Sequence, residues 1–280
     1  MRRLLTIPEL RDALRDPRGT VGLVPTMGFL HAGHMSLVKT ARDENDVVVV
    51  TIFVNPTQFG PNEDLATYPR DMERDLSLLE VAGVDFVFTP EASEMYPSGY
   101  SSYVTVEGLT DKLEGAFRPG HFRGVATVVS KLLNLVPADR AYFGQKDAQQ
   151  VVVIRRMASD LNFRHEISVV PTVREPDGLA LSSRNVYLSP EQRRSALALS
   201  RSLFTSRDLF EAGEREAGKI RSAAEAVLFS EPGVKVDYVA VVDRDTFEDL
   251  ETIQGEALVV LAARVGPTRL IDNVVLGLSG

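Results

Sequence analysis

The chain has 280 residues, of which 44% are hydrophobic and 25% are charged, and such a chain can bury a globular core. Its formal net charge of -8 argues against broad binding of nucleic acid, which requires a basic surface. Cysteine is absent, which excludes disulfides, thiolate metal sites and a cysteine nucleophile.

The N-terminal segment begins with basic residues, but its apolar stretch stops at Pro8, which is too short for a signal-peptide core. The longest apolar-rich run, residues 47–54, is far shorter than the roughly 20 residues that span a bilayer. This run predicts a buried strand instead. We therefore expect a cytoplasmic protein that has neither a nucleic-acid partner nor a membrane partner.

Strands and helices alternate through about the first 170 residues, and the first strand, loop, helix and second strand form a βαβ unit. The pattern predicts a Rossmann-like, doubly wound α/β domain with a parallel sheet over residues 1–172. The expected strands are 21–26, 47–54, 85–89, 141–144 and 167–170. The expected helices are 34–42, 71–81, 122–136 and 147–161, with a loop at 28–33.

The pattern changes after Asn185. Ser189, Pro190 and Gln192 have the spacing of a capped helix start, and a helical region runs from there towards residue 229 with an interruption near Gly213. Two apolar strands are expected after it, at 236–242 and 257–263. These elements predict a smaller C-terminal α+β domain over residues 173–280.

The sequence PTMGFLHAGH at positions 25–34 lies where the first strand passes into the first helix. Ligands of open α/β sheets bind beyond the carboxyl ends of the strands, and a helix N-terminus there favours an anion. His31 and His34 can both face that anion, and Gly28 and Gly33 let the backbone come close. A pair of surface histidines at a helix cap is the alternative, but half of the chain's four histidines fall here. We interpret them as imidazolium donors that stabilise charge on a phosphate.

Two further segments suit phosphate binding. LSSRN at 181–185 offers two hydroxyls and a guanidinium, although such loops are often ordinary solvated turns. FGQKD at 143–147 starts a helix and offers the Lys146 ammonium to phosphate oxygens, while Asp147 also suits a plain helix cap. Gln150 lies early in that helix, where an amide can face the same crevice or be exposed.

NPTQFG at 55–60 follows the second strand. Gln58 can hydrogen-bond a hydroxyl or a carboxylate, and a simple proline-bearing loop is the equal alternative. Three of the four polar segments thus follow predicted strands, at the edge of the sheet where ligands bind.

Together the motifs resemble the nucleotidyltransferase superfamily related to class I aminoacyl-tRNA synthetases and, within it, the pantothenate synthetase family. The resemblance rests on the His-x-Gly-His junction, the serine-rich loop and long matching segments between positions 25 and 273. These segments are PTMGFLHAGH, TIFVNPTQFGPNEDLATYPRD, RPGHFRGVATVV, FGQKDAQQ, PTVREPDGLALSSRNVYL and ARVGPTRLIDN.

The resemblance implies an ATP-dependent ligase that condenses pantoate with β-alanine through a pantoyl adenylate, with release of AMP and pyrophosphate. It implies magnesium with the ATP and a homodimer. The residues that it implies for substrate binding are Asn55, Gln58 and Gln150. The residues that it implies for ATP binding are Met27, Gly28, Phe29, Leu30, His31, Ala32, Gly33, His34, Gly144, Gln145, Lys146, Asp147, Val173, Leu181, Ser182, Ser183 and Arg184.

The catalytic group implied in this way consists of His34, His31, Lys146 and Arg184. The two histidines would stabilise charge at the α-phosphate, and the lysine and arginine, with the two serines, would hold the β- and γ-phosphates. We expect the loop 59–69 to act as a lid and the C-terminal domain to cover the nucleotide site. Asp75 is the nearest candidate for contact with the metal, but Arg74 beside it does not favour that role, so no metal ligand is assigned.

Four positions depart from the usual wording of the family. Ala32 and Gln145 stand where glutamate is common, Ala148 where tyrosine is common, and Leu181 where methionine is common. The change at Leu181 conserves volume and should be mild. The loss of two acidic groups alters the charge near the nucleotide, so we expect an effect on affinity more than on activity.

Two other functions fit parts of the sequence. A nucleotidyltransferase acting on a phosphate substrate would keep the His-x-Gly-His motif and would also suit the LSSRN segment, but the segments 55–58 and 143–150 favour the ligase. A non-catalytic nucleotide-binding protein is the third interpretation, and the full set of polar site residues argues against it.

Overall fold

The structure is a computed structural model, and it describes residues 1–61 and 63–277. Its backbone contacts divide the chain into two compact units. The first unit comprises residues 1–144 and 153–171, and the second comprises residues 145–152 and everything from 172 onward. The short segment 145–152 therefore groups with the C-terminal part of the chain. A functional domain boundary at 172/173 stays a prediction.

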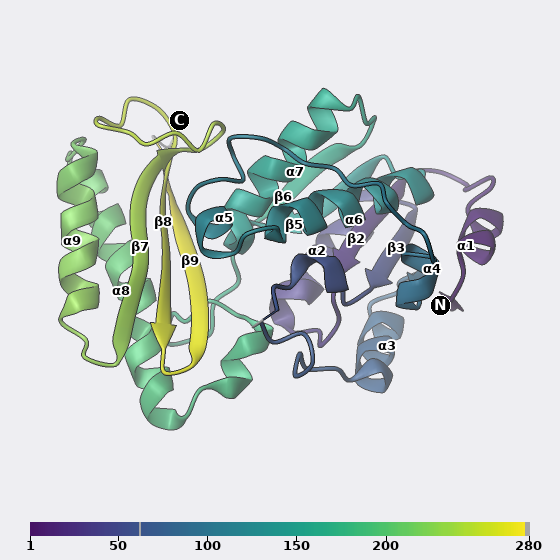
Figure 1. The fold of residues 1–280 in the computed structure, drawn as a ribbon, viewed down its shortest axis with the longest axis horizontal. Helices are drawn as coiled ribbons and strands as arrows, with labels where there is room; N and C mark the ends of the chain where they lie inside the picture. Colours follow the sequence, from purple (N-terminus) through teal and green to yellow (C-terminus); the bar gives the residue numbers. More distant parts are fainter. Residues whose placement is uncertain (62, 278–280) are drawn as a thin grey trace. The chain divides into compact units, whose positions relative to one another are not determined.

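The first unit is built on a six-stranded parallel sheet in the order β1-β4-β3-β2-β5-β6 (Figure 1). Each central strand is almost wholly apolar because both faces of the sheet are covered. This confirms the Rossmann-like fold expected from the sequence. The strands are β1 (Arg2–Leu4), β2 (Val21–Thr26), β3 (Val47–Ile52), β4 (Phe86–Phe88), β5 (Arg140–Gly144) and β6 (Glu166–Val170).

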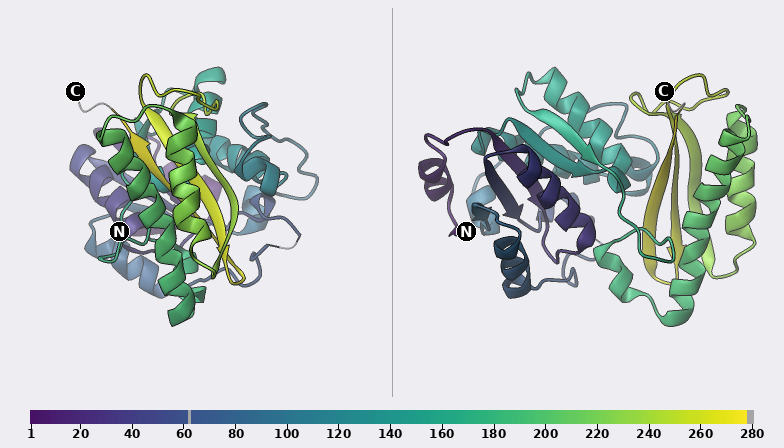
Figure 2. Two further views of the ribbon diagram at one scale, coloured as in Figure 1. Left: turned by 90° about the vertical axis from the view of Figure 1, so that its left-hand side faces the viewer. Right: turned by 180° about the vertical axis from the view of Figure 1, so that it is seen from behind.

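Helices cover both faces of this sheet. Helix α6 lies in front of it in Figure 1, and α2 and α3 lie on the opposite face, which the rear view in Figure 2 brings forward. Val48, Val50 and Ile52 of β3 share a core with those two helices. The helices are α1 (Ile7–Ala13), α2 (Ala32–Glu44), η1 (Pro56–Gln58), α3 (Met72–Val81), α4 (Ala92–Met95), α5 (Glu114–Phe117), α6 (His121–Leu135) and α7 (Ala148–Asp160).

The second unit consists of a three-stranded antiparallel sheet, β7-β8-β9, and two long helices on one of its faces (Figure 1). Its elements are η2 (Gln145–Asp147), the start of α7, η3 (Ser183–Tyr187), α8 (Pro190–Glu211), α9 (Ala217–Phe229), β7 (Val234–Asp243), β8 (Ala257–Val265) and β9 (Thr268–Leu276). Ser189 and Gln192 form the expected capping box of α8, and Gly213 lies in the predicted interruption after it.

Strand β9 was not predicted, since only two strands were expected in this part of the chain. Its sequence, TRLIDNVVL, contains Arg269, Asp272 and Asn273, and these polar residues interrupt the apolar pattern by which a strand is recognised. Asp272 and Asn273 are nevertheless buried, each 3% exposed.

Four helix starts also differ from the prediction, and among them α3 begins one residue later and α6 one residue earlier than expected. Helix α2 begins at Ala32, so His31 is its N-cap and Gly33 lies inside it. Asp147 belongs to the 3-10 turn η2, so α7 begins one residue later than expected. Within residues 1–61 and 63–277, the structure contains no helix with the length and apolar character required to cross a bilayer.

Candidate active site

The turn after β2 has a rare backbone conformation. Gly28 has a φ of +84° and Phe29 a φ of +49°, both in the left-handed region. A Cβ atom on Gly28 would lie 2.9 Å from Ile52 Cγ2 and 3.1 Å from an oxygen of Asp75, so the site requires glycine. Thr26 Oγ1 accepts the Gly28 N–H at 3.2 Å. The chain can therefore pass from the strand into α2 within a few residues.

Asp75, near the start of α3, supports this turn. It is 1% exposed, and its Oδ2 and Oδ1 accept the N–H groups of Phe29 and Leu30, each at 2.7 Å. Arg74 Nη1 donates to Leu30 O at 2.9 Å, and its guanidinium lies 5.8 Å from the centre of the Phe29 ring. Burial raises the pKa of Asp75, while the two N–H bonds and Arg74 oppose that rise.

The sequence suggested Asp75 only as a neighbour of the metal. Its role in the turn was missed because the partners are 45 and 46 positions away, and no local pattern links them.

His31 and His34 lie together at the N-terminus of α2. His31 Nδ1 accepts the Gly33 N–H at 3.1 Å, and His34 Nδ1 accepts the His31 N–H at 3.4 Å. The ring centroids are 4.1 Å apart. The two backbone N–H groups thus fix both rings through their Nδ1 atoms. Both rings lie at a helix end where the dipole favours an anion.

Gln58 lies beside this motif within the first unit. Its Nε2 donates to Met27 Sδ at 3.0 Å, and its Oε1 accepts from Asn55 Nδ2 at 3.1 Å. Asn55 is 1% exposed and also donates to Gly124 O at 3.1 Å, while its Oδ1 accepts the Tyr96 hydroxyl at 2.8 Å. These bonds fix the Gln58 amide so that its NH₂ group is the donor on the side of Met27.

The segment RPGHF at 118–122, to which no role was assigned, supports the backbone of Gln58. His121 Nδ1 lies 2.9 Å from Gln58 O, and its Nε2 lies 3.1 Å from Arg118 Nη1. Arg118 also donates to both carboxylate oxygens of Glu63, at 2.8 and 2.6 Å. Since Arg118 can only donate, His121 is neutral with its proton on Nδ1. Burial and the Arg118 charge lower the pKa of His121 to about 4.

In the second unit, Lys146 lies on the turn η2. Its side chain is 19% exposed, and Nζ is 3.8 Å from Asp147 Oδ1. Asn273 of β9 donates from Nδ2 to the carbonyls of Gln145 and Lys146, each at 2.9 Å, and its Oδ1 accepts from Gln145 Nε2 at 3.1 Å. Gln150, in the first turn of α7, is half-buried.

The serine-rich segment is a structured turn. Leu181 N–H donates to Val173 O at 3.0 Å, which closes the loop that precedes the segment. Ser182 caps η3, and its Oγ accepts the Arg184 N–H at 3.2 Å. Ser183 is 8% exposed. These hydrogen bonds hold the segment in one turn, and its role in phosphate binding stays a prediction.

The structure thus gathers the predicted residues in two sets. Within the first unit, residues 27–34 lie beside Asn55 and Gln58, and Gly144 ends β5. Within the second unit, β9 contacts both η2 and η3, which carry Gln145 to Asp147 and Ser183 with Arg184.

No group of three or more histidine, aspartate or glutamate side chains with the arrangement of a metal site occurs among residues 1–61 and 63–277. Both oxygens of Asp75 already accept backbone N–H groups.

The first unit is a Rossmann-like α/β unit with a parallel sheet and a His-x-Gly-His motif at the N-terminus of α2. The model of the family described as pantoate-beta-alanine ligase matches residues 2–275. The chain therefore belongs to the pantoate–β-alanine ligase family, which confirms the resemblance found in the sequence.

Relatives extend over the whole chain. The pantothenate synthetase of Moorella thermoacetica is 62% identical over 279 residues, which cover 99% of each chain. The crystal structure of pantothenate synthetase from Thermus thermophilus is 53% identical, with a TM-score of 0.95 over 98% of this chain and 99% of that one. A pantoate-beta-alanine ligase from Francisella tularensis, complexed with beta-gamma ATP and beta-alanine, is 34% identical, with a TM-score of 0.80 over 98% of this chain and 97% of that one.

Proposed function

We propose that this chain condenses pantoate with β-alanine at the expense of ATP, which yields pantothenate, AMP and pyrophosphate. The observation that carries the proposal is the pair of imidazole rings of His31 and His34, whose centroids lie 4.1 Å apart at the start of α2, beside the buried Gln58 amide. Membership of the pantoate–β-alanine ligase family supports it, as does the complex of the Francisella tularensis relative with beta-gamma ATP and beta-alanine.

The first step forms an acyl adenylate. A pantoate carboxylate oxygen attacks the α-phosphorus of ATP, the new P–O bond forms, and the bond to pyrophosphate breaks. His34, His31 and the α2 N-terminus stabilise the negative charge that builds up on the α-phosphate oxygens. Lys146 and Arg184, with the hydroxyls of Ser182 and Ser183, hold the β- and γ-phosphates as pyrophosphate leaves.

The second step transfers the acyl group. The β-alanine amine attacks the carbonyl carbon of pantoyl adenylate, the amide bond forms, and AMP leaves with the shared oxygen while the amine loses a proton. Gln58 and Gln150 orient pantoate, and Gln58 helps to receive the amine. Asn55 contributes by fixing the Gln58 amide. No covalent bond to the enzyme is needed, so positioning and electrostatics supply the catalysis.

The proposal assigns ATP binding to the same residues as the sequence analysis. They are Met27, Gly28, Phe29, Leu30, His31, Ala32, Gly33, His34, Gly144, Gln145, Lys146, Asp147, Val173, Leu181, Ser182, Ser183 and Arg184. Magnesium enters as the ATP complex and neutralises phosphate charge. The proposal further includes a homodimer, to be tested by light scattering of the purified protein, and a cytoplasmic location, to be tested by cell fractionation.

The loop 59–69 is proposed as the lid that excludes water from the mixed anhydride. Residue 62 lies outside the described residues. The ion pair between Glu63 and Arg118 gives the loop a defined attachment to the C-terminal end of α5. Limited proteolysis tests the lid: ATP with pantoate should protect the loop, and equal cleavage with and without them would contradict the idea.

The function is tested by exchange of labelled pyrophosphate into ATP in the presence of magnesium and the absence of β-alanine. Exchange that requires pantoate is the expected result, and addition of β-alanine should then give AMP and pantothenate in equal amounts. A nucleotidylated product that forms without any amine would support the nucleotidyltransferase instead. Binding of ATP without AMP formation under any of these conditions would support a non-catalytic nucleotide-binding protein.

A further inference from the structure

Two adjacent polar residues, Asp272 and Asn273, are buried in β9. Each is 3% exposed, and the strand around them packs into the apolar core of the second unit through Leu270 and Leu276. Burial of polar groups is costly unless their hydrogen bonds are satisfied. The hydrogen-bond partners of Asp272 and Asn273 therefore indicate why a core strand contains these polar residues.

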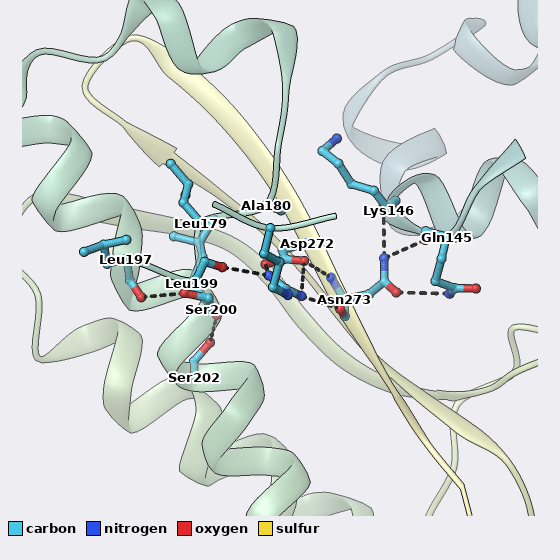
Figure 3. A network of polar contacts seen from close by, with 12 residues as sticks. Gln145, Lys146, Leu179, Ala180, Leu197, Leu199, Ser200, Ser202, Asp272 and Asn273 are labelled. Carbon is cyan, nitrogen blue, oxygen red and sulfur yellow. Dashed lines mark hydrogen bonds and ion pairs between the residues drawn. The ribbon is translucent and has the colours of Figure 1, made fainter. Parts of the chain in front are cut away.

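Asn273 uses its whole amide to hold the turn η2. Nδ2 has two hydrogens, and they go to the carbonyls of Gln145 and Lys146, while Oδ1 accepts from Gln145 Nε2. Figure 3 shows that the Lys146 carbonyl faces Asn273 and that the lysine side chain extends away from it. Asn273 thus holds the backbone from which Lys146 projects, without contact to the ammonium. A glutamate at position 145 could not donate the third of these bonds.

Asp272 holds the loop that leads to the serine-rich turn. Its carboxylate pairs with Arg174 through two bonds, of 2.6 and 2.9 Å, which is the geometry of an ionised bidentate pair. Arg174 also donates to Gly178 O at 3.1 Å and to Asn273 O at 3.2 Å. These bonds hold the loop 173–181, which leads directly to Ser182. Figure 3 shows Ala180, Asp272 and Asn273 in this network.

We infer that Asp272 and Asn273 are positioning residues that fasten two phosphate-binding segments to one strand: Asn273 places Lys146, and Asp272, through Arg174, places the turn from Ser182 to Arg184. The inference rests on the proposed function. Neither residue is among those proposed to contact the substrates. Each fixes backbone from which a phosphate-binding side chain projects, and displacement of such a side chain by about 1 Å can cost about 10²-fold in rate.

A purely structural role for this network makes a different prediction. If Asn273 only stabilised the fold, its loss would lower stability and the amount of active protein, and every substrate would be affected alike. If it places Lys146, its loss selectively weakens the use of ATP, and the effect disappears when the Lys146 side chain is already absent.

The test is a double-mutant cycle in the full chain with Asn273→Ala, Lys146→Ala and the double variant. The readouts are kcat/KM for ATP in pantoate-dependent pyrophosphate exchange and ATP affinity by calorimetry. We expect Asn273→Ala to lower kcat/KM for ATP about tenfold or more, with KM for pantoate within about twofold. In the Lys146→Ala background the same change should cost less than about twofold. Equal losses in the two backgrounds would overturn the inference.

Controls separate positioning from stability. Leu228 of α9 is fully buried in the core of the same unit. Leu228→Ala opens a cavity there and should lower the melting temperature without a change in KM for ATP. Asn134→Ala, on an exposed turn of α6, removes an amide that donates to Ser130 O at 2.9 Å and should change nothing. If Asn273→Ala does not fold, Asn273→Ser keeps a polar group there and should raise KM for ATP in the same way.

Wild-type protein that shows no exchange would refute the proposed function, and the calorimetric cycle would still report whether Asn273 acts on ATP binding through Lys146. Wild-type protein that exchanges, combined with additive effects in the cycle, would refute the inference alone.

Discussion

Two strand-to-helix turns carry the proposed ATP contacts, and opposite kinds of hydrogen bond hold them in place. The turn 28–30 gives its N–H groups to the carboxylate of Asp75. The turn 145–147 gives its carbonyl groups to the neutral amide of Asn273. The first support is a buried ionisable group within the first unit, and the second is a neutral group on the last strand of the second unit.

A turn can therefore be held in place through its backbone N–H groups or through its backbone carbonyl groups. A carboxylate only accepts hydrogen bonds, so it suits a turn that presents N–H groups, and it must be desolvated to do so. An asparagine amide can donate twice, so it suits a turn that presents carbonyls. The comparison predicts that the first turn is sensitive to loss of a charge and that the second is sensitive to loss of a donor.

The largest expected effect is that of His34→Ala. Loss of one donor to the transition-state charge should lower the rate of adenylate formation by roughly 10²-fold or more, with little change in ATP affinity. Single-turnover release of pyrophosphate measures this rate. The matched control is His165→Ala. His165 lies outside the site, and its Nε2 contacts Val136 O. An unchanged rate in folded His34→Ala protein would remove His34 from the mechanism.

Lys146→Ala should act mainly on ATP. Without the ammonium, KM for ATP should rise by about one to two orders of magnitude, and kcat at saturating ATP should change less. The measurement is the initial rate of pyrophosphate release over a range of ATP concentrations. Lys235→Ala removes an exposed lysine of the same unit and serves as control. Normal pyrophosphate release at low ATP would contradict the role of Lys146.

Asp75→Asn tests the support of the first turn. The amide keeps one acceptor and turns an NH₂ group towards the other backbone N–H, so one buried bond is lost at a cost of about 1–3 kcal/mol. We expect a lower free energy of unfolding and about a tenfold loss in kcat, because His31 and His34 follow the turn directly. Urea denaturation and pyrophosphate exchange measure the two effects.

The control for this variant is Asp71→Asn, at the N-cap of the same helix, because asparagine caps a helix as well as aspartate does. An equal loss of kcat in both variants would mean that Asp75 acts through its negative charge at the start of α3 and not through its hydrogen bonds to the turn.

The smallest effect on activity is expected from substitution of His121. The prediction for this residue concerns the pH dependence of stability. The pKa of His121 is about 4 in the folded chain and 6.5 in its unperturbed state, so the unfolded chain binds an extra proton between these values. The stability that the neutral side chain contributes is complete above pH 6.5 and is lost as the pH falls towards 4. The loss amounts to about 3 kcal/mol.

His121→Gln should flatten the dependence of the free energy of unfolding on pH in this range. Urea denaturation at a series of pH values measures that dependence. Carboxylates elsewhere titrate in both proteins, so the difference between the two curves isolates His121. Parallel curves for the two proteins would refute the assignment.

Much of the candidate site could be proposed from the sequence, because strand-to-helix junctions and the glycines and histidines at positions 28–34 form local patterns. The Rossmann-like sheet was predicted for the same reason, since apolar runs of strand length mark its buried strands. The supports of the site could not be predicted. Asp75 lies 45 positions from Leu30, and Asn273 lies 127 positions from Lys146, so only the folded chain brings each pair together.

The same reasoning explains why β9 was missed. Asp272 and Asn273 make the segment look polar, and their burial is favourable only because Arg174 and the η2 carbonyls lie next to them in the fold. A pattern of apolar residues along one segment contains no information about such partners.

The central claim is that the pantoate carboxylate attacks the α-phosphate of ATP, and transfer of ¹⁸O tests it most directly. Pantoate labelled with ¹⁸O in both carboxylate oxygens should be incubated with the enzyme, ATP, magnesium and β-alanine, and the AMP should be analysed by mass spectrometry. The mechanism predicts one ¹⁸O atom in each AMP, because the bridging oxygen of the anhydride leaves with AMP. AMP that forms together with pantothenate but contains no ¹⁸O would contradict the acyl adenylate.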